Sequence, residues 1–342
     1  MPRQYFRPVV SCDVARPVGA HAVAGGRGWF THVEVIARGK PPWIIAASEV
    51  PETAIAPLIA PRPTILGMTW DRPVIMGIVN TTPDSFSDGG LHAAAADAIA
   101  AGLSMADAGA DVLDIGGEST RPGAQLVDLA EEIRRVVPVI TGLRAQGFTG
   151  AISIDTRKSD VASAALDAGA DLINDVSGFT FDPSLATVAA TAGAPVCIMH
   201  GPVDPSVMHK DPRYDDVLLD VYDFLEARIA ALISAGVPRG SIIVDPGIGF
   251  AKTQDHNLAL LARLSLLHGL GMPLLLGASR KRFIGTIGQT PDARKRAPGS
   301  IAVALGGLAQ NVQMVRVHDV AETYQAIALW RAMHGDVPPF SG

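Results

Sequence analysis

The sequence predicts an α/β fold, a closed (β/α)8 TIM barrel with a β-rich N-terminal extension, and two observations lead to that prediction. Short apolar runs recur from residue 74 onward, and a helical segment follows each of them. This alternation is typical of a parallel sheet covered by helices, and eight repeats are the number that closes a barrel. The sequence Ala-Gly-Ala-Asp also occurs twice, at 108–111 and 168–171, each time between a helix and the next strand.

The strands are recognised as apolar runs that are too short for a helix and bounded by turn residues. The first, at 74–79, stops abruptly at Asn80, where a polar, Gly-rich loop begins. No Gly-x-Gly-x-x-Gly follows a strand, which disfavours the alternative, a doubly wound open sheet that binds a dinucleotide. The remaining strands are expected at 111–116, 151–154, 171–173, 195–199, 241–244, 273–276 and 313–317.

The segments between the strands have helical length. The first of them is rich in Ala and ends at Gly109, a typical helix stop, and Gly169 ends the third in the same way. The helices are expected at 93–108, 129–145, 160–168, 183–191, 214–235, 257–268, 298–310 and 320–333.

Residues 1–72 differ from the rest of the chain and predict an N-terminal extension of unknown role, ahead of a catalytic barrel domain at 73–342. The extension is rich in Pro and Gly, and it contains two strand-like stretches, at 29–38 and 43–47. The Pro-rich stretch 51–63 is expected to be a linker. No combination of residues in the extension points to catalysis.

Composition narrows the class of partner. With a net charge of -6 and a pI near 5.8, a nucleic-acid or acidic-membrane partner is not expected. The two cysteines, Cys12 and Cys197, are too few for a disulfide framework or a zinc cluster. The first residues lack the apolar core of a signal peptide, and no run approaches the ~20 apolar residues of a membrane span. A cytoplasmic protein is therefore expected.

Polar side chains follow every predicted strand, and in a barrel these positions converge on one mouth, where catalytic groups belong. Asp155, Asn174 and Asp245 offer acceptors that suit a heterocycle carrying amino and ring N–H donors. Paired Asp residues could also act as general acid and base. Phe250, on a Gly-rich loop, could stack on a planar ligand.

A second group of residues suits anions. Arg316 and His318 are two residues apart and so face the same side of the last strand. With Arg121 and Asn80 they could hold a phosphate or diphosphate and stabilise charge on a leaving group. Lys281 could bind a carbonyl or carboxylate.

The loops that follow these strands carry motifs that resemble the dihydropteroate synthase family, in the right order, from Val74 to His334. The motifs are Asn80-Thr-Thr-Pro-Asp-Ser-Phe-Ser-Asp-Gly-Gly, Asp114-Ile-Gly-Gly-Glu-Ser-Thr-Arg-Pro-Gly, Asp155-Thr, Asn174-Asp-Val-Ser-Gly, Asp245-Pro-Gly-Ile-Gly-Phe, Ser279-Arg-Lys and Arg316-Val-His-Asp-Val. The resemblance implies a transferase of folate biosynthesis that joins 6-hydroxymethyl-7,8-dihydropterin diphosphate to para-aminobenzoate and releases diphosphate. It also implies a likeness to sulfonamide targets and assembly as a homodimer through the late helices.

The resemblance assigns roles to residues of this sequence. It implies a pterin site of Asp155, Asn174, Asp245 and Lys281, with Met199, Phe250 and Arg316 against the ring. The diphosphate site would consist of Asn80, Arg121, Arg316 and His318. Asn80 would also contact Mg²⁺, and the loops with Phe86 and with Thr120, Arg121 and Pro122 would close over para-aminobenzoate. The catalytic residues implied are Asp155, Lys281, Arg316 and Arg121.

Three positions depart from the family pattern. Thr81 replaces a more usual Val, Gly201-Pro-Val-Asp follows His200 where Met-x-Gly is frequent, and Arg282 stands where Ser is common. The second departure leaves a non-catalytic pterin-binding relative as an alternative. A pterin-dependent methyltransferase and a phosphosugar barrel are further alternatives.

Overall fold

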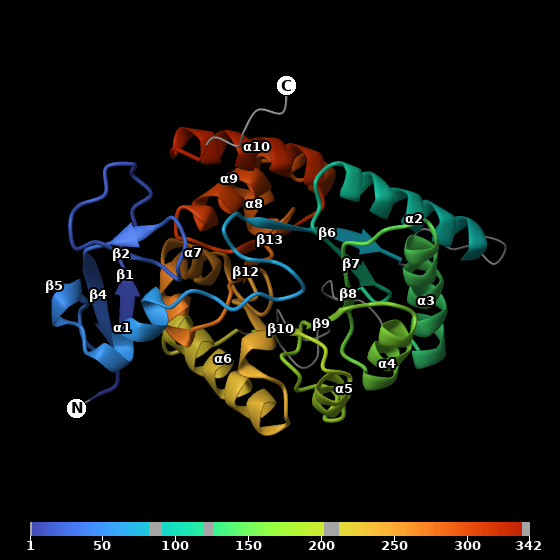
Figure 1. Ribbon diagram of the computed structural model, residues 1–342, viewed down its shortest axis with the longest axis horizontal. Coiled ribbons are helices and arrows are strands. Elements are labelled where there is room, and N and C mark those ends of the chain that lie inside the picture. Colours follow the sequence, from blue (N-terminus) through green and yellow to red (C-terminus); the bar gives the residue numbers. More distant parts are fainter. Residues whose placement is uncertain (1, 82–90, 120–125, 202–211, 337–342) are drawn as a thin grey trace.

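The chain forms a β-rich extension beside a helix-covered barrel, as the computed structural model shows (Figure 1). It describes residues 2–81, 91–119, 126–201 and 212–336, without the side chains of 91–93. Within these residues, no helix has both the length and the apolar character that crossing a membrane requires.

The barrel consists of eight parallel strands in the order β11-β10-β9-β8-β7-β6-β13-β12. A parallel bridge between Val244 and Leu274 joins β11 to β12 and closes the ring, with the Val244 amide donating to the Pro273 carbonyl over 3.0 Å. The predicted barrel is thus confirmed, and the open-sheet alternative is excluded. The strands are β6 (Val74–Asn80), β7 (Val112–Gly116), β8 (Ala151–Asp155), β9 (Leu172–Asp175), β10 (Val196–Met199), β11 (Ile242–Asp245), β12 (Leu275–Leu276) and β13 (Met314–Val317).

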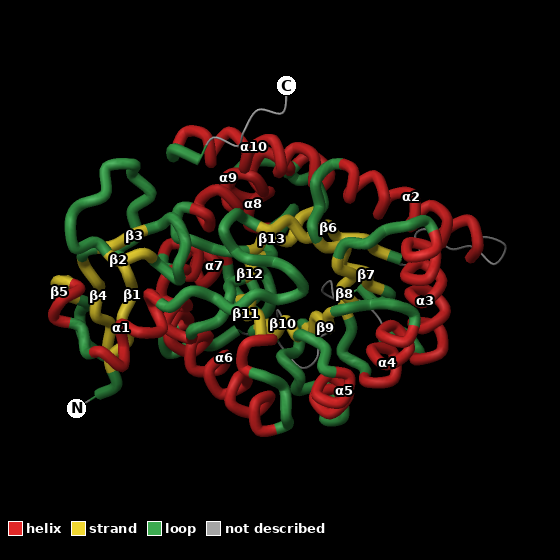
Figure 2. The backbone as a smooth tube through the Cα atoms, in the orientation of Figure 1, coloured by secondary structure: helices red, strands yellow, loops and turns green. Residues whose placement is uncertain are grey.

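Helices surround the strands on the outside, as Figure 2 shows. The helix predicted at 257–268 is wrong in its second half, because α7 ends at Ala262 and a 3₁₀ segment, η5 (Leu264–Leu270), follows. The short helix α8 was not predicted, since six residues carry little periodicity. The helices are α2 (Leu91–Asp107), α3 (Leu129–Ala145), α4 (Ser159–Asp167), α5 (Leu185–Ala192), α6 (Val217–Ser234), α7 (Gln254–Ala262), α8 (Arg282–Ile287), α9 (Ala297–Leu308) and α10 (Val320–Met333).

The extension forms two small antiparallel sheets. The first contains β1 (Gln4–Pro8), β4 (His32–Ala37) and β5 (Trp43–Ala46), and the second contains β2 (His21–Ala22) and β3 (Trp29–Phe30). The predicted strand at 29–38 is therefore split between two sheets, and β1 was not predicted.

The linker predicted at 51–63 is wrong, because helix α1 (Glu52–Ile59) occupies most of it. Pro51 stands just before the helix, a position where its missing N–H costs nothing. Pro57 lies inside the helix and would normally disfavour it. Leu58 is completely buried in the core of the extension, and this tertiary burial offsets the local cost.

The last part of the extension packs against the barrel. Ile65 and Trp70 belong to the same apolar cluster as Val74 and Met76 of β6, so they cover the end of the barrel where the strands begin. The Trp70 indole also donates to the Pro63 carbonyl over 2.7 Å. The boundary between residues 72 and 73 stays a prediction.

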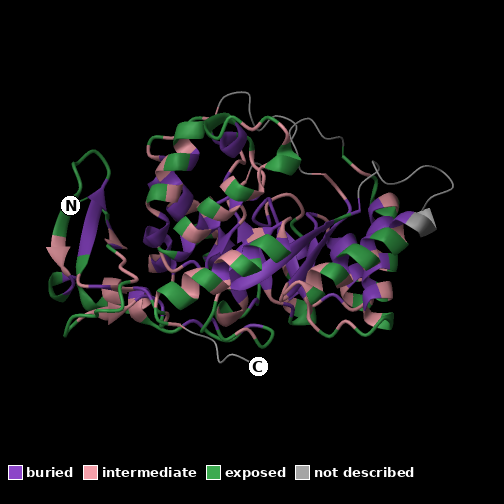
Figure 3. Ribbon diagram, turned by 90° about the horizontal axis from the view of Figure 1, so that it is seen from above, coloured by how far each residue is buried: buried purple, intermediate pink, exposed green. Residues whose placement is uncertain are grey.

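Alternate residues of each strand point into the barrel. Along the strands these inward side chains form two layers that differ in polarity. The strands in the middle of the molecule are almost entirely buried (Figure 3). We call the apolar cluster nearer the strand starts the lower layer; it contains Met76, Val112, Leu172, Cys197, Ile243, Leu275 and Met314. We call the polar side chains at the strand ends the upper layer; they are Asp114, Asp155, Asn174, Asp245 and Arg316.

Candidate active site

Arg316 is the centre of the upper layer. Its Nε donates to Asp114 Oδ2 over 2.6 Å, and one of its terminal nitrogens donates to Asp155 Oδ2 over 2.7 Å. The Asn174 amide donates to the same Asp114 oxygen over 3.2 Å. Four strands, β7, β8, β9 and β13, thus contribute to one hydrogen-bonded group, and three of its members were predicted to share a site.

Asp114 was named only as the first residue of a family motif, and its central position was missed. It is completely buried, and its Oδ1 has no hydrogen-bond partner among the described residues. A buried acceptor without a donor is costly unless a ligand supplies one. Its position two residues after Val112, on an inward face, was the signal that could have identified it.

Two carboxylates of the upper layer, Asp155 and Asp245, are hard to ionise. Burial raises the pKa of Asp155 to about 7, against the charge of Arg316, and the nearby carboxylates of Asp114 and Asp175 raise it further. Burial likewise raises the pKa of Asp245 to about 6, although the Gly247 amide and the Lys281 charge oppose it. These sites therefore favour a ligand that brings N–H donors or positive charge.

The end of β11 and the loops after β11 and β12 bring Asp245, Phe250 and Lys281 close together. The Lys281 ammonium lies over the Phe250 ring, 3.9 Å from its centroid. Gly249 has a φ of +83°, and a Cβ there would lie 2.9 Å from Lys281 Cδ, so only glycine lets the lysine stem pass so close. Gly277 lies against Asp245 in a similar way, since its Cβ would be 3.1 Å from Oδ2.

Met199 and His318 border the same group. Met199 pairs in register with Asp245 and is buried, so it lies beside the upper layer at the end of β10. His318 follows β13, and its Nδ1 lies 2.9 Å from the Ser279 hydroxyl. Burial, together with the charges of Arg280 and Arg316, lowers the pKa of His318 to about 3, so the ring is neutral near pH 7.

Asn80 is exposed at the end of β6, opposite Gly116 in register. The next residue, Thr81, donates its hydroxyl to the Gly116 carbonyl over 3.0 Å, which a Val could not do. Four predicted site residues lie outside the described residues, and these are Phe86, Thr120, Arg121 and Pro122.

The mouth of the barrel offers few protein ligands for Mg²⁺. Among the described residues, no group of three His, Cys, Asp or Glu could hold a metal ion. Mg²⁺ usually takes one or two protein oxygens and completes its shell with substrate phosphates and water. A single exposed amide oxygen from Asn80 fits that pattern, because Mg²⁺ does not require a cage built only of protein ligands.

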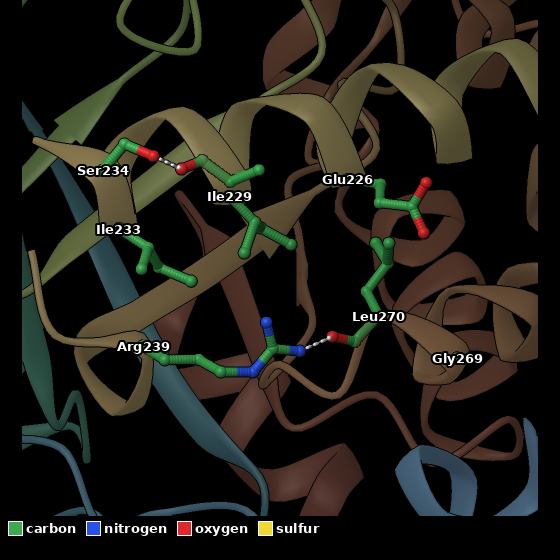
Figure 4. A pocket seen from close by; sticks show the side chains of 8 residues that line it. Glu226, Ile229, Ile233, Ser234, Arg239, Gly269 and Leu270 are labelled. Carbon is green, nitrogen blue, oxygen red and sulfur yellow. Dashed lines mark hydrogen bonds between the residues drawn. The ribbon is translucent and has the colours of Figure 1, made fainter. Parts of the chain in front are cut away.

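A separate cavity of about 420 Å³ lies away from the mouth. It is bounded by Glu226 and Ile233 of α6, by Arg239 just before β11, and by Leu270 at the end of η5, and Arg239 donates to the Leu270 carbonyl over 2.8 Å (Figure 4). These segments precede their strands, so the cavity lies toward the end of the barrel opposite the mouth. Its lining includes none of the predicted site residues.

Comparisons with known proteins agree with this geometry. The model of the family described as "Pterin binding enzyme" matches residues 76–318. A protein of Synechocystis sp. named dihydropteroate synthase is 46% identical over 279 residues, which are 79% of this chain and 96% of that protein. A solved Xanthomonas albilineans dihydropteroate synthase with 4-aminobenzoic acid has a TM-score of 0.74 and 46% identity, covering 81% of this chain and 99% of its own.

A second solved structure of the Xanthomonas albilineans enzyme is a complex with 7,8-dihydropteroate. It has a TM-score of 0.71 and 43% identity, and the match covers 81% of this chain and all of that chain. The family model, which begins at residue 76, spans the barrel strands and their strand-end motifs and leaves the N-terminal extension outside. This chain belongs to the pterin-binding enzyme family and, within it, to the dihydropteroate synthases, which are transferases.

Proposed function

We propose that the chain condenses 6-hydroxymethyl-7,8-dihydropterin diphosphate with para-aminobenzoate, giving 7,8-dihydropteroate and diphosphate in folate biosynthesis. The observation that carries the proposal is the buried upper layer, in which Arg316 joins Asp114 and Asp155 while Asn174 and Asp245 complete the ring of acceptors. Such a layer matches a flat heterocycle with several N–H donors.

The pterin ring is bound by groups from both sides of the mouth. Asp245 and Asn174 accept from the ring N–H and amino groups, and Lys281 donates to the ring carbonyl. The Phe250 ring, already in contact with the Lys281 ammonium, offers an apolar surface at the edge of the ligand. Met199 supplies a polarizable contact at the end of β10.

The diphosphate is bound by His318, Asn80 and Arg121, with Arg316 nearby. In this proposal the Ser279 hydroxyl, 2.9 Å from Nδ1, donates to the neutral His318 ring, so that Nε2 carries the proton and donates to the diphosphate. Mg²⁺ would be held by Asn80 and the diphosphate, and when bound it neutralises part of the charge of the leaving group.

The reaction exchanges one bond to the pterin methylene carbon for another. The C–O bond breaks, and its electron pair leaves with diphosphate. The lone pair of the para-aminobenzoate nitrogen then forms the C–N bond, and the proton that this nitrogen loses passes to solvent water. Asp155, when ionised, stabilises the positive charge on the pterin, while Arg316 and Arg121 stabilise the departing anion. The loops with Phe86, Thr120 and Pro122 close over para-aminobenzoate in this proposal.

We also propose that two copies pair through the α7–α9 face. A cavity of about 780 Å³ lies there, lined by apolar side chains that include Phe283 and Val303. Ile287 and Leu258, also in the lining, are 54% and 40% exposed. Light scattering on a size-exclusion column measures the assembly, and Ile287→Glu is expected to convert a dimer to a monomer.

The cytoplasmic location of the protein stays a prediction, and cell fractionation tests it.

A coupled assay of diphosphate release tests the proposed function. Wild-type protein with the pterin diphosphate and Mg²⁺ should turn over only when para-aminobenzoate is added. Lys281→Ala and Arg316→Ala should each reduce the rate about a hundredfold or more. Arg294→Ala is the matched control, since its side chain is 85% exposed, and it should keep the wild-type rate. Pterin binding without product would indicate the non-catalytic relative instead.

A further inference from the structure

Lys252 is a buried lysine that none of the assigned roles uses. It is only 4% exposed. Its ammonium lies 2.9 Å from His200 Nδ1, 2.9 Å from the Gly247 carbonyl, 3.0 Å from the Phe250 carbonyl and 3.2 Å from the His200 carbonyl. No carboxylate of the described residues forms a salt bridge with it. Four acceptors around three N–H donors therefore replace water for the charged form, although burial lowers the pKa of Lys252 to about 7.

The acceptors come from two different loops of the mouth. His200 is the first residue after β10, whereas Gly247 and Phe250 belong to the loop after β11. β10 and β11 are already paired by backbone hydrogen bonds. The Lys252 side chain adds a second connection, between the loops that follow these two strands. A buried donor shared by two loops fixes their distance, because moving either loop would leave a buried polar group unpaired.

His200 is suited to accept from Lys252. Burial and the Lys252 charge lower the pKa of His200 to about 3, so the ring is neutral, and its Nδ1 can accept. The ring is held by aromatic neighbours, edge-on to Phe224 at 4.8 Å and tilted to Tyr214 at 5.9 Å between centroids. The acceptor is therefore preorganised.

The two loops are packed as closely as their backbones allow. Gly247 has a φ of +69°, and a Cβ there would lie 1.9 Å from the His200 carbonyl oxygen. The Gly247 amide at the same time donates to Asp245 Oδ1 over 2.7 Å. Lys252 accordingly holds a loop that contacts the upper layer directly.

The same loop places the pterin contacts. Phe250, whose carbonyl accepts from Lys252, has the Lys281 ammonium over its ring. Gly249 borders the Lys281 stem. The donors of Lys252 point at these two loops, and the loop after β11 contacts both Asp245 and Lys281.

We infer that Lys252 is a positioning residue for the pterin ring. It holds the loops after β10 and β11 together, so that Phe250 and Lys281 meet the ring at the height that Asp245 requires. The inference rests on the proposed function and deepens it, since it names a residue that governs affinity for the pterin without touching it.

Lys252→Met tests the inference, because it keeps the length of the side chain and removes every donor. The KM for the pterin diphosphate is expected to rise about tenfold or more, as loosened positioning costs binding and rate. The KM for para-aminobenzoate should stay within about twofold. Direct binding of 6-hydroxymethylpterin should weaken by the same factor as the pterin KM. Lys252→Arg, which keeps donors, should recover part of the loss.

Two further variants separate positioning from general damage. Thr253→Val is the matched control, because it removes a hydrogen bond next to Lys252, the one by which the Thr253 hydroxyl accepts from the His256 amide over 3.2 Å at the start of α7, and leaves the bonds between the two loops intact; it should bind pterin normally. In the Lys281→Ala background, Lys252→Met should cost much less than in wild type, since the group it positions is absent.

Three results would contradict the inference that Lys252 positions the pterin contacts. An unchanged pterin affinity of Lys252→Met, a rise in both KM values by equal factors, or full additivity with Lys281→Ala would overturn the inference. If Lys252→Met does not fold, Lys252→Gln, which keeps one amide donor, is measured in its place by the same criteria. Failure of the wild-type protein to form product would refute the proposed function instead, so the two failures are distinguishable.

Discussion

The lower and upper layers of the barrel lie on the same strands, only two residues apart. Val112 leads to Asp114 on β7, and Leu172 leads to Asn174 on β9. Both layers point inward and both are buried, yet one is apolar throughout and the other contains three carboxylates and a guanidinium. Because both layers are buried inside the same barrel, the difference between them reflects the chemistry of their side chains.

The contrast shows that stability and binding are separated along the strand axis. Burial of the lower layer stabilises the fold, at about 25 cal/mol for each Å² of apolar surface removed from water. The upper layer carries charged groups whose desolvation raises carboxylate pKa values, so it contributes little to stability and provides groups for a ligand. Substitutions in the lower layer should therefore reduce the free energy of unfolding and spare activity, whereas substitutions in the upper layer should reduce activity and spare stability.

The largest effect is expected from Asp155→Asn in the upper layer. The change keeps the shape and removes the charge that stabilises a cationic pterin, so kcat/KM should fall about 10²–10³-fold. The melting temperature should not fall, because one of several crowded, buried carboxylates is removed and Arg316 keeps Asp114. Steady-state kinetics and calorimetry on the same preparation measure both. A lower melting temperature with normal kinetics would contradict the separation of the layers.

Leu172→Ala in the lower layer should show the reverse. Leu172 is completely buried, and its truncation should lower the free energy of unfolding by about 3 kcal/mol through lost burial and a residual cavity. Its inward neighbour Asn174 stays in place, so activity per folded molecule should remain within about twofold of wild type. Urea denaturation gives the first quantity and active-site titration the second. Loss of activity in a fully folded sample would show that the layers are coupled.

A smaller effect concerns pH. The pKa of Asp245 in the folded protein is about 6, above its usual value of 3.8, so the folded state holds a proton between these values. The contribution of this group to stability is thus fully present below pH 3.8 and is lost as the pH rises through 6. Pterin recognition by Asp245 needs the ionised form and should follow the opposite trend.

We expect the affinity for 6-hydroxymethylpterin to fall by about tenfold per pH unit below pH 6. This probe lacks the diphosphate, whose own titration would confuse the profile. Fluorescence titration at several pH values measures the affinity. Asp245→Asn is the control, and it should bind more weakly, with a flatter profile. The same slope in both proteins would assign the titration to another group.

The smallest effect is expected outside the barrel, where the extension contacts α6. Arg38 pairs with Asp220 over 2.6 Å and with Asp223 over 2.7 Å, but its side chain is 39% exposed. Arg38→Ala should therefore cost less than about 1 kcal/mol, and less still at high salt. Denaturant unfolding at two salt concentrations measures this, and kcat/KM should not change. A large loss of activity would mean that the extension, unlike the lower layer, acts on the mouth.

Some features of the fold and site could be predicted because they depend on local patterns. The apolar runs, their helical partners and the polar residues at the strand ends follow from periodicity along the chain. In contrast, β1 and α1 were missed, because short segments with Pro residues have weak local signals and are fixed by contacts with distant ones. Tyr5 of β1, for example, donates to Asp223 of α6 over 2.8 Å.

The sequence by itself determined the barrel, the order of its strands along the chain and the set of polar groups at its mouth. Only the tertiary structure decided how these groups pair. That Arg316 bridges Asp114 and Asp155, and that Lys252 is buried between two loops, depends on the closure and register of the sheet. A pattern of alternate residues records which face is buried, whereas the contacts within that face join residues that lie far apart in the chain.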